Sequence, residues 1–437
     1  MCLPASGGCH RTTQMKKLFL ITICCLLFAV FVQDSIADKD SNYSFTRLRI
    51  TKLHSGKADK TIKIVIVGDG YTEKDLVAKG KYESDCERLV SAFLKKAPFQ
   101  KYQDYFDFYA IYALSYDRGA ENNPGEDKKR NILDCTVETN PDGTPKNRLI
   151  RFQKPERLGR IVKNAWVNDL DTILVIVNDS REAGSGNTLV YNKQEMPAPT
   201  FTNAGDFENA AMHEFGHSFA DLADEYVDCT MIDKYVLPAT GDLTNPNVTL
   251  AALVQTDTKE SLEETLKWRH FLKLPGAEGV IGLYSGGHYR PKGVYRSQAD
   301  CFMRTFGFNV DFCFVCQEAI VRAIYRKTGL PFDDQDYHRQ NPIKVKVKED
   351  YLTLFEKDIG YYFDGLFAEA EKSVKKTKGS KKGIISPLEK TVEEYAQWLE
   401  KPGFITTLPI KNQGRLKTLA VDLRNRLKAF KKSQKIE

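Results

Sequence analysis

Histidine is scarce in this chain, with only 7 among 437 residues. The net charge is also small, +6 at pH 7, so no general excess of basic residues indicates nucleic-acid binding. The glycine-containing segment Gly184-Ser185-Gly186 is not followed by a G-x-x-x-x-G-K-[ST] pattern, so we expect no phosphate-binding loop there. These absences leave the composition of an ordinary globular protein that is long enough for two or three domains.

The N-terminus has the pattern of an export signal. Lys16-Lys17 supplies the basic region, residues 18–32 form a nearly unbroken apolar run, and Ala37 ends a segment that a signal peptidase accepts. We therefore predict upstream residues and a signal peptide at 1–37. The protein would be exported to the periplasm, the cell surface or the medium, with membrane contact only through this segment. A retained membrane anchor is the alternative, although the apolar run is slightly short for a span.

Ten cysteines become six beyond the predicted signal: Cys86, Cys135, Cys229, Cys301, Cys313 and Cys316. An even number of cysteines in an oxidising compartment predicts disulfides, whose pairing the sequence does not reveal. Cys313-x-x-Cys316 together with Cys301 is instead compatible with a structural zinc site. No second C-x-x-C completes that set of ligands.

Two of the rare histidines lie four residues apart, in the segment His213-Glu214-Phe215-Gly216-His217. On a helix, this spacing turns both imidazoles to one face, where they can bind one metal ion. Glu214 then lies beside the open coordination position, where a zinc-activated water needs a base. With so few histidines, H-E-x-x-H arises by chance in roughly one chain in a hundred or fewer. The motif predicts a hydrolase with one catalytic Zn²⁺; a surface helix with two incidental histidines is the alternative.

A catalytic zinc site takes a third protein ligand, and the acidic residues that follow the motif are its candidates. On a continuing helix, Asp224 would lie about 16 Å along the axis from His213, far outside a coordination sphere of about 2 Å. The chain must therefore leave the helix soon after His217 and double back. We predict Asp224 as the third ligand, with Glu225 as the alternative and Asp221 as the weakest candidate.

Hydrophobic periodicity predicts an α/β (α+β) catalytic domain in which a mixed sheet packs on helices and the motif helix lies at the cleft. We expect strands at 62–67, 106–114 and 173–177, helices at 74–96, 206–222 and 314–326, and loop-like sequence at 118–147. The strand that ends at Asn178 is our candidate for the rim where an extended substrate adds as an edge strand. We predict a short polar segment at 38–60, the zinc-dependent catalytic domain at 61–330 and a basic helical region at 331–437.

Several longer motifs carry a family resemblance. They are IVIVGDGYTEKD at 64–75, LVIVNDS at 174–180, HEFGHSFADLADEY at 213–226, YRPKGVYRSQADCFM at 289–303 and DCFMRTFGFNVDFCFVC at 300–316. Over roughly 60–328 the chain resembles the bacterial IgA-metallopeptidase family, peptidase family sixty-four of the metallo class. Members are exported, metzincin-like zinc endopeptidases, and the type enzyme cuts immunoglobulin A.

The resemblance implies zinc ligands at His213 and His217, a catalytic base at Glu214, and the third ligand in the pair Asp224-Glu225. Met303 matches the methionine of the turn that forms an apolar floor beneath the metal. Candidates for stabilising the transition state are Tyr226, Tyr289, Tyr295 and Arg296.

The chain departs from the usual metzincin spacing after the second histidine. Ala220 stands where a glycine is expected, and Ala223 stands where the third ligand is expected. The predicted function is nevertheless hydrolysis of peptide bonds through a zinc-activated water. The expected partner is a protein or peptide substrate, with glycoproteins and immunoglobulins among the candidates and no nucleic acid. The alternative is a non-catalytic binding protein on a zincin scaffold that recognises a host or surface glycoprotein.

Overall fold

The computed structural model describes residues 43, 45, 48–165, 167, 169–250, 265–305, 307, 309–344, 351–401 and 413–435. The predicted export signal lies outside these residues. Leu48–Glu437 form one unit of the structure.

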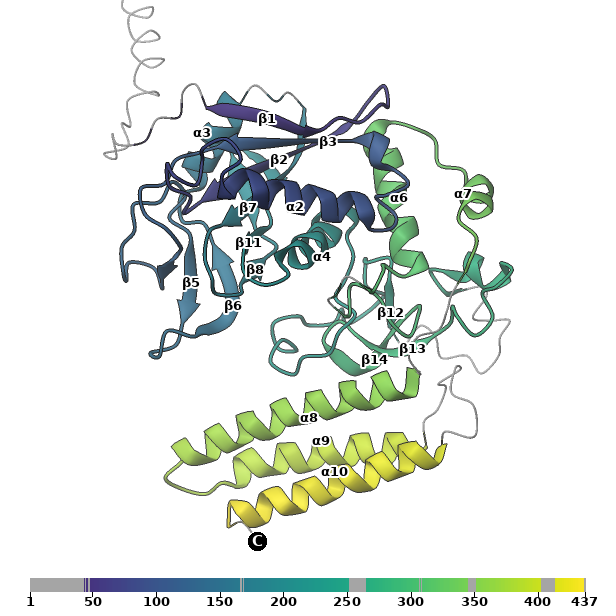
Figure 1. Cartoon of the computed structure of the whole chain (residues 1–437). Helices are drawn as coiled ribbons and strands as arrows, with labels where there is room; N and C mark the ends of the chain where they lie inside the picture. The colour runs from purple at the N-terminus through teal and green to yellow at the C-terminus, as the bar shows by residue number, and fades with distance from the viewer. Residues whose placement is uncertain are drawn as a thin grey trace, which may run out of the picture. The chain divides into compact units, whose positions relative to one another are not determined.

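The central sheet has six strands in the order β1-β3-β2-β7-β11-β8 (Figure 1). In chain order these are β1 (Arg49–His54), β2 (Ile62–Asp69), β3 (Phe106–Tyr112), β7 (Leu170–Val177), β8 (Gly184–Ser185) and β11 (Thr200–Thr202). Strands β3, β2, β7 and β11 are parallel to their neighbours, whereas β1 and β8 at the two edges are antiparallel. The β-branched runs of β2 and β7 lie inside the sheet, where both faces are covered, which explains their nearly continuous apolar sequence.

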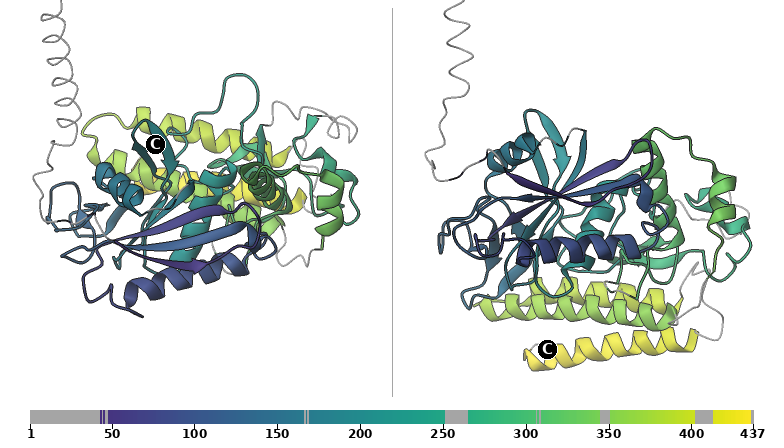
Figure 2. Two further views of the ribbon diagram at one scale, coloured as in Figure 1. Left: turned by 90° about the horizontal axis from the view of Figure 1, so that it is seen from above. Right: turned by 45° about the horizontal axis from the view of Figure 1, so that its top comes forward.

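Three helices pack on one face of this sheet: α2 (Lys81–Lys95), α4 (Phe207–Ala220) and α6 (Phe314–Thr328). Both views of Figure 2 show α2 running along the sheet. Ile64 of β2, Leu89 of α2, Phe215 of α4 and Ile320 of α6 belong to one hydrophobic core. The sheet thus carries the motif helix α4 on the same face as α2 and α6, as predicted for a mixed sheet packed on helices.

Helix α2 begins seven residues later than predicted. The carboxylate of Asp75 accepts hydrogen bonds from the Thr72 N–H (2.9 Å) and the Thr72 hydroxyl (2.7 Å). These bonds close a turn ahead of the helix, because a short acidic side chain competes for nearby backbone donors.

The segment 118–147, predicted as a loop, contains strands. They are β4 (Glu121–Asn122), β5 (Thr136–Thr139) and the start of β6 (Pro145–Arg151), which form a separate small sheet. The buried carboxylate of Asp69 anchors this region by accepting the N–H groups of Leu133 (3.0 Å) and Cys135 (2.9 Å). The strands escaped prediction because they are short and lack an apolar run.

The remaining elements before the motif are η1 (Gln103–Tyr105), α3 (Pro155–Asn164) and the pair β9 (Thr188–Tyr191) and β10 (Gln194–Pro197).

The glycine- and tyrosine-rich segment after the motif forms part of another three-stranded sheet. Its strands are β12 (Val248–Leu250), β13 (Tyr284–Gly287) and β14 (Arg290–Arg296), in the order β12-β14-β13. Gly286 has a φ of 104°, and a Cβ there would lie 2.7 Å from Nη1 of Arg296. This position therefore requires glycine. The short helices η3 (Arg269–Lys273) and α7 (Asp334–Gln340) flank α6 in sequence.

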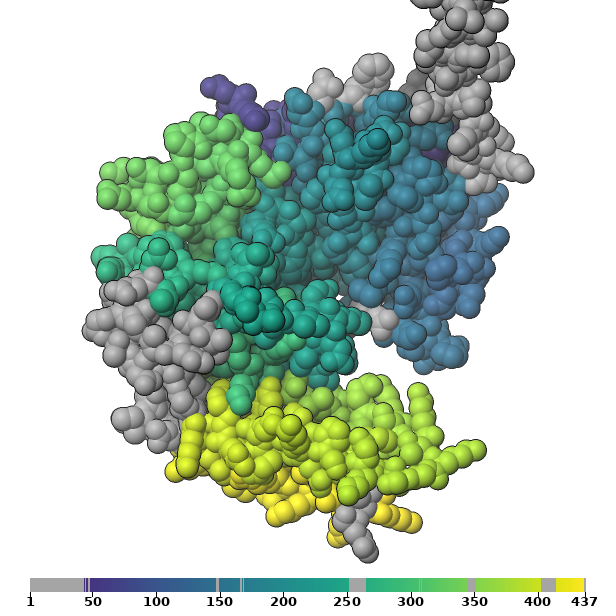
Figure 3. Space-filling model, turned by 180° about the vertical axis from the view of Figure 1, so that it is seen from behind, coloured from purple at the N-terminus to yellow at the C-terminus, as the bar shows by residue number. Residues whose placement is uncertain are grey.

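Three long helices end the chain: α8 (Tyr351–Lys376), α9 (Lys382–Glu400) and α10 (Gln413–Ser433). Phe355, Val392 and Leu423, one from each helix, share a second hydrophobic core, which also includes Val227 and Tyr284 from the segment that follows the motif. Figure 3 shows these helices in yellow-green and yellow against the teal and green segments. Among the described residues, no helix combines the length and apolarity that a membrane span requires.

Candidate metal centre and active site

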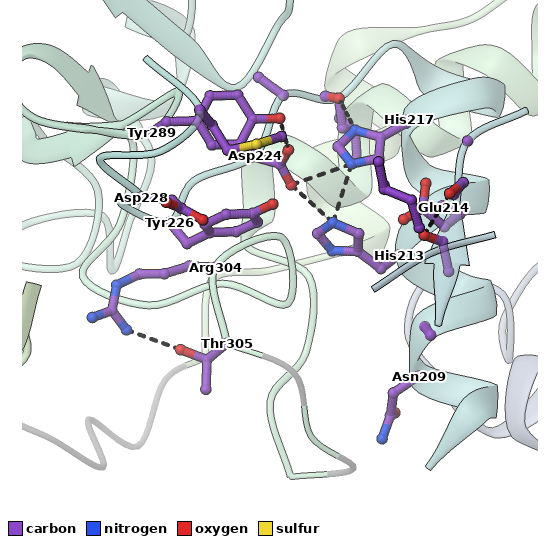
Figure 4. Close-up of a pocket in the computed structure, with 18 of the residues that line it drawn as sticks. Asn209, His213, Glu214, His217, Asp224, Tyr226, Asp228, Tyr289, Arg304 and Thr305 are labelled. Atoms are coloured by element: carbon purple, nitrogen blue, oxygen red, sulfur yellow. Dashed lines mark hydrogen bonds and ion pairs between the residues drawn. The ribbon is translucent and has the colours of Figure 1, made fainter. Parts of the chain in front are cut away.

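Helix α4 brings the two histidines of the motif together. His213 and His217 lie one turn apart on one face, and their Nε2 atoms are 3.1 Å apart (Figure 4). The other side of the helix carries Phe215 and Phe219, which are buried in the core. Burial of these aromatic rings fixes the rotation of the helix and turns the histidine face outward.

The helix ends three residues after His217, where the chain reverses. Asp221 has a left-handed conformation (φ 54°), and the N–H of Leu222 donates to the carbonyl of Gly216 (3.3 Å). Such a left-handed residue commonly closes a helix, and a short acidic side chain tolerates it better than most others. The reversal returns the chain toward the histidines.

Asp224 completes the cluster. Its Oδ1 atom lies 2.8 Å from Nε2 of His213 and 3.2 Å from Nε2 of His217. The structure therefore brings together the three residues that we predict as zinc ligands, and the reversal that the prediction required takes place at Asp221.

Neighbouring groups orient these side chains. Nδ1 of His217 lies 2.6 Å from the carbonyl oxygen of Leu222, so a proton on Nδ1 is donated there and Nε2 is left as the ligand atom. The hydroxyl of Tyr289 donates to Oδ2 of Asp224, and the His288 N–H donates to the Asp224 carbonyl (2.8 Å). These hydrogen bonds fix the positions of two of the three ligand atoms before any ion binds.

The electrostatics of the cluster favour a cation. Burial acts to raise the pKa of Asp224, but the charges of His217 and His213 and their hydrogen bonds hold it well below its usual value. Burial acts to lower the pKa of His217, but Asp224 and Glu214 raise it to about 9. A site that stabilises a positive charge this strongly is suited to a divalent metal ion.

The geometry fits zinc. In a tetrahedral site with bonds of about 2.0–2.1 Å, the ligand atoms are about 3.3 Å apart. The three atoms here are separated by 2.8, 3.1 and 3.2 Å. Two imidazoles and one carboxylate also form a donor set that zinc takes in catalytic sites, where a fourth position is left open.

Glu214 lies beside the cluster on the cavity wall. Burial raises the pKa of its carboxyl group, while the charges of His213 and His217 oppose the increase. Gly186 faces this carboxylate closely, since a Cβ at that position would lie 3.0 Å from Oε2 of Glu214. The sequence did not predict this contact between Gly186 and Glu214, because it depends on where the edge of the sheet lies relative to α4.

Met303 is fully buried and packs against the motif helix. Gly216 lies in α4 directly before His217, and a Cβ at this position would lie 3.1 Å from the Met303 sulfur. The Met303 carbonyl accepts the N–H of Glu225 at 2.9 Å. The methionine is thus placed under the helix segment that carries the histidines.

The other predicted site residues separate into two groups. Tyr226 and Tyr289 line the cavity at the cluster. Tyr295 and Arg296 do not line it, and the buried guanidinium of Arg296 donates to the carbonyls of Ser285 and Gly286 (both 2.8 Å). Arg296 therefore supports the irregularity within β13, between Ser285 and Gly287, and does not line the cavity.

Glu225, the alternative third ligand, faces away from the histidines. Its carboxylate lies among cysteines, 3.3 Å from Sγ of Cys316. Adjacent residues in an extended segment point to opposite sides, so one of the pair Asp224-Glu225 had to turn away.

The cluster opens into a cavity of about 1560 Å³. One wall is formed by β8 and the segment that follows it, Gly184–Asn187, and another by Lys357, Asp358 and Tyr361 of α8. In Figure 3 the surface is hollowed between the blue segment that contains β6 and the yellow-green helix α8. The cavity wall formed by α8 was not predicted, because a local sequence pattern does not indicate which face of a distant helix packs beside the cleft.

The expected rim strand also needs correction. The strand before Asn178 is β7, which pairs with β2 on one side and β11 on the other. An interior strand has no free edge to which a substrate could add. The edge strand beside Glu214 is β8.

All six cysteines beyond the predicted signal are free thiols in the structure, which does not support the predicted disulfides. Cys86 and Cys135 are buried in separate parts of the core, and Cys229 is partly buried. The other three meet around Glu225.

Comparison with known proteins identifies the family. No curated protein matches the chain. The family described as IgA Peptidase M64 matches residues 50–275 and 271–324, a span of more than half of the 437 residues that contains the whole histidine–aspartate cluster. This match confirms the predicted resemblance. The chain belongs to the IgA Peptidase M64 family of peptidases.

Proposed function

We propose that this chain is an exported, zinc-dependent endopeptidase. The observation that carries the proposal is the convergence of His213, His217 and Asp224 at the cavity, with Glu214 beside them. When bound there, zinc supplies Lewis-acid activation of a water molecule and of the scissile carbonyl group. The sequence pattern of residues 1–37 supports export.

Glu214 is the catalytic base in this proposal. Its carboxylate takes the proton of the attacking water and returns it to the amine that leaves. The raised pKa of the partly buried carboxyl group suits this role, because a base works best when its pKa is near the operating pH. Tyr226, which also lines the cavity, is a candidate for hydrogen bonding to the oxygen that gains charge.

The cavity favours an extended polymeric substrate. Its volume of about 1560 Å³ exceeds the range of about 300–1,000 Å³ that is typical of small-molecule pockets. The edge strand β8 offers a main chain along which a peptide can lie as an added strand. The name of the family refers to immunoglobulin A, so immunoglobulins and other glycoproteins are among the candidate substrates.

The test is cleavage of a broad peptide library by the zinc-loaded protein and by Glu214→Gln. We expect the substitution to lower kcat by about 10²–10⁴-fold, because it removes the proton acceptor while retaining shape. Glu278→Gln, which changes an exposed glutamate outside the cavity, is the matched control. Zinc binding without cleavage by the wild type would contradict the proposal and favour a binding protein on the same scaffold.

A further inference from the structure

Directly after Asp224, the chain contributes to a second cluster of metal-ligating side chains. Glu225, Cys301, Cys313 and Cys316 each offer one ligand atom, and these four atoms all lie within 4.8 Å of one another. All four residues are buried. Cys301 comes from the loop before Met303, whereas Cys313 is the N-cap of α6 and Cys316 lies in its first turn.

The distances match a tetrahedral site. Zinc–sulfur bonds of about 2.3 Å place two sulfur ligands about 3.8 Å apart, and a sulfur and an oxygen ligand about 3.5 Å apart. Sγ of Cys301 and Sγ of Cys316 are 3.7 Å apart. Oε1 of Glu225 lies 3.3 Å from Sγ of Cys316 and 3.8 Å from Sγ of Cys313. These three separations are close to the values that a tetrahedral zinc site gives.

One oxygen of the Glu225 carboxylate has no hydrogen-bond partner in the described part of the chain, and a bound cation would provide a partner. The side chain is 0% exposed, and its Oε1 accepts hydrogen bonds from the Asn247 amide (2.9 Å) and from the weakly donating thiol of Cys316 (3.3 Å). Its Oε2 has no hydrogen-bond partner among the described residues, and no described lysine, arginine or histidine forms an ion pair with it. A buried carboxylate without a counter-charge is costly, and a bound divalent cation removes that cost.

Backbone donors point at the sulfur atoms. The N–H of Cys313 lies 3.3 Å from Sγ of Cys301, the N–H of Met303 lies 3.4 Å from the same sulfur, and the N–H of Cys316 lies 3.4 Å from Sγ of Cys313. Such donors, together with the N-terminus of α6, favour thiolate over thiol, and thiolate is the form that binds metal.

We propose that Glu225, Cys301, Cys313 and Cys316 bind a structural zinc ion, separate from the ion proposed at the cleft. Four protein ligands leave no open position, which is characteristic of structural and not of catalytic zinc. Glu225 supplies the fourth ligand that the cysteine pattern alone did not provide. The ion would link the Asp224–Glu225 segment to the Met303 loop and to α6. It would thereby fix the position of Asp224, the proposed third ligand of the catalytic site.

Metal analysis of the full chain tests this proposal. The wild type is expected to hold two zinc ions per chain, and the double variant His213→Ala/His217→Ala is expected to retain one. X-ray absorption at the zinc edge should show sulfur neighbours at about 2.3 Å in both proteins. The double variant Cys313→Ser/Cys316→Ser should lose the sulfur-bound ion. Cys86→Ser, which changes a buried thiol outside the cluster, should keep it.

A gentler variant covers the case in which the double cysteine variant does not fold. Glu225→Gln keeps an acceptor for Asn247 but removes the charge, so zinc should be released to a chelator at least about 10-fold more readily. Zinc without sulfur neighbours in the wild type would overturn the proposal. A disulfide between Cys301 and Cys316 in the zinc-loaded protein would overturn it as well. A wild type with only the sulfur-bound ion would support this inference and contradict the proposed function.

Discussion

The carboxylates of Asp224 and Glu225, neighbours in the chain, face two different groups of ligand atoms. Oδ1 of Asp224 lies 2.8 Å from Nε2 of His213, whereas Oε1 of Glu225 lies 3.3 Å from Sγ of Cys316. This pair of adjacent residues therefore links the cleft to the buried cysteine cluster.

Asp224→Asn should weaken zinc binding at the cleft more than any neighbouring acidic substitution. Asparagine keeps the size of the side chain but removes the charge that binds the ion. We expect a loss of affinity at least as large as the roughly 10–100-fold known for partners outside the coordination sphere. Competition with a chelator measures this. Asp221→Asn, at the exposed end of α4, is the control, and equal affinities for both variants would refute the ligand assignment.

Tyr289→Phe should lower zinc affinity without touching a ligand. Its hydroxyl donates to Oδ2 of Asp224, and loss of that bond frees the carboxylate to rotate. We expect a decrease of about 10-fold or more, measured by the same competition. Tyr226→Phe removes a hydroxyl from the same cavity without removing the hydrogen bond to Asp224. The account is contradicted if Tyr226→Phe weakens zinc binding and Tyr289→Phe does not.

Gly186→Ala should reduce cleavage by displacing Glu214, the proposed catalytic base. The added methyl group would lie 3.0 Å from Oε2 of Glu214, so the carboxylate must move by a few tenths of an ångström. A misplacement of about 1 Å can cost about 100-fold in rate, so we expect a smaller loss, below about 100-fold, from this shift. Gly184→Ala, whose Cβ would meet only Ala210 at 4.0 Å, should lose less. Steady-state kcat distinguishes them, and the reverse order would show that Gly186 does not position Glu214.

Asp358→Ala should destabilise the fold where α8 meets the cleft. The Asp358 carboxylate lies 2.7 Å from Nη2 of Arg304 and 3.7 Å from Nη2 of Arg296, and all three side chains are largely buried. Removal of one partner from a buried ion pair costs about 3 kcal/mol or more, because the other charge stays buried. Chemical denaturation measures the free energy of unfolding. Glu369→Ala, from an exposed pair with Lys372, should cost about 1 kcal/mol or less, and similar values for both variants would count against this role of Asp358.

Sequence patterns predicted the parts of the site that depend on local geometry. The spacing of His213 and His217 placed both rings on one helix face, and the reach of a helix required the reversal that occurs at Asp221. Long-range packing was beyond these patterns. The wall from α8, the edge position of β8 and the approach of Glu225 to the cysteines all depend on which distant segments meet, and hydrophobic periodicity carries no such information.

The most direct test of the central claim is anomalous diffraction at the zinc edge from crystals of the zinc-loaded protein. We predict a peak bounded by Nε2 of His213, Nε2 of His217 and Oδ1 of Asp224, at about 2.0–2.2 Å from each atom. Absence of a peak at these three atoms, or a peak there with Asp224 turned away and a different third ligand, would contradict the proposed catalytic site.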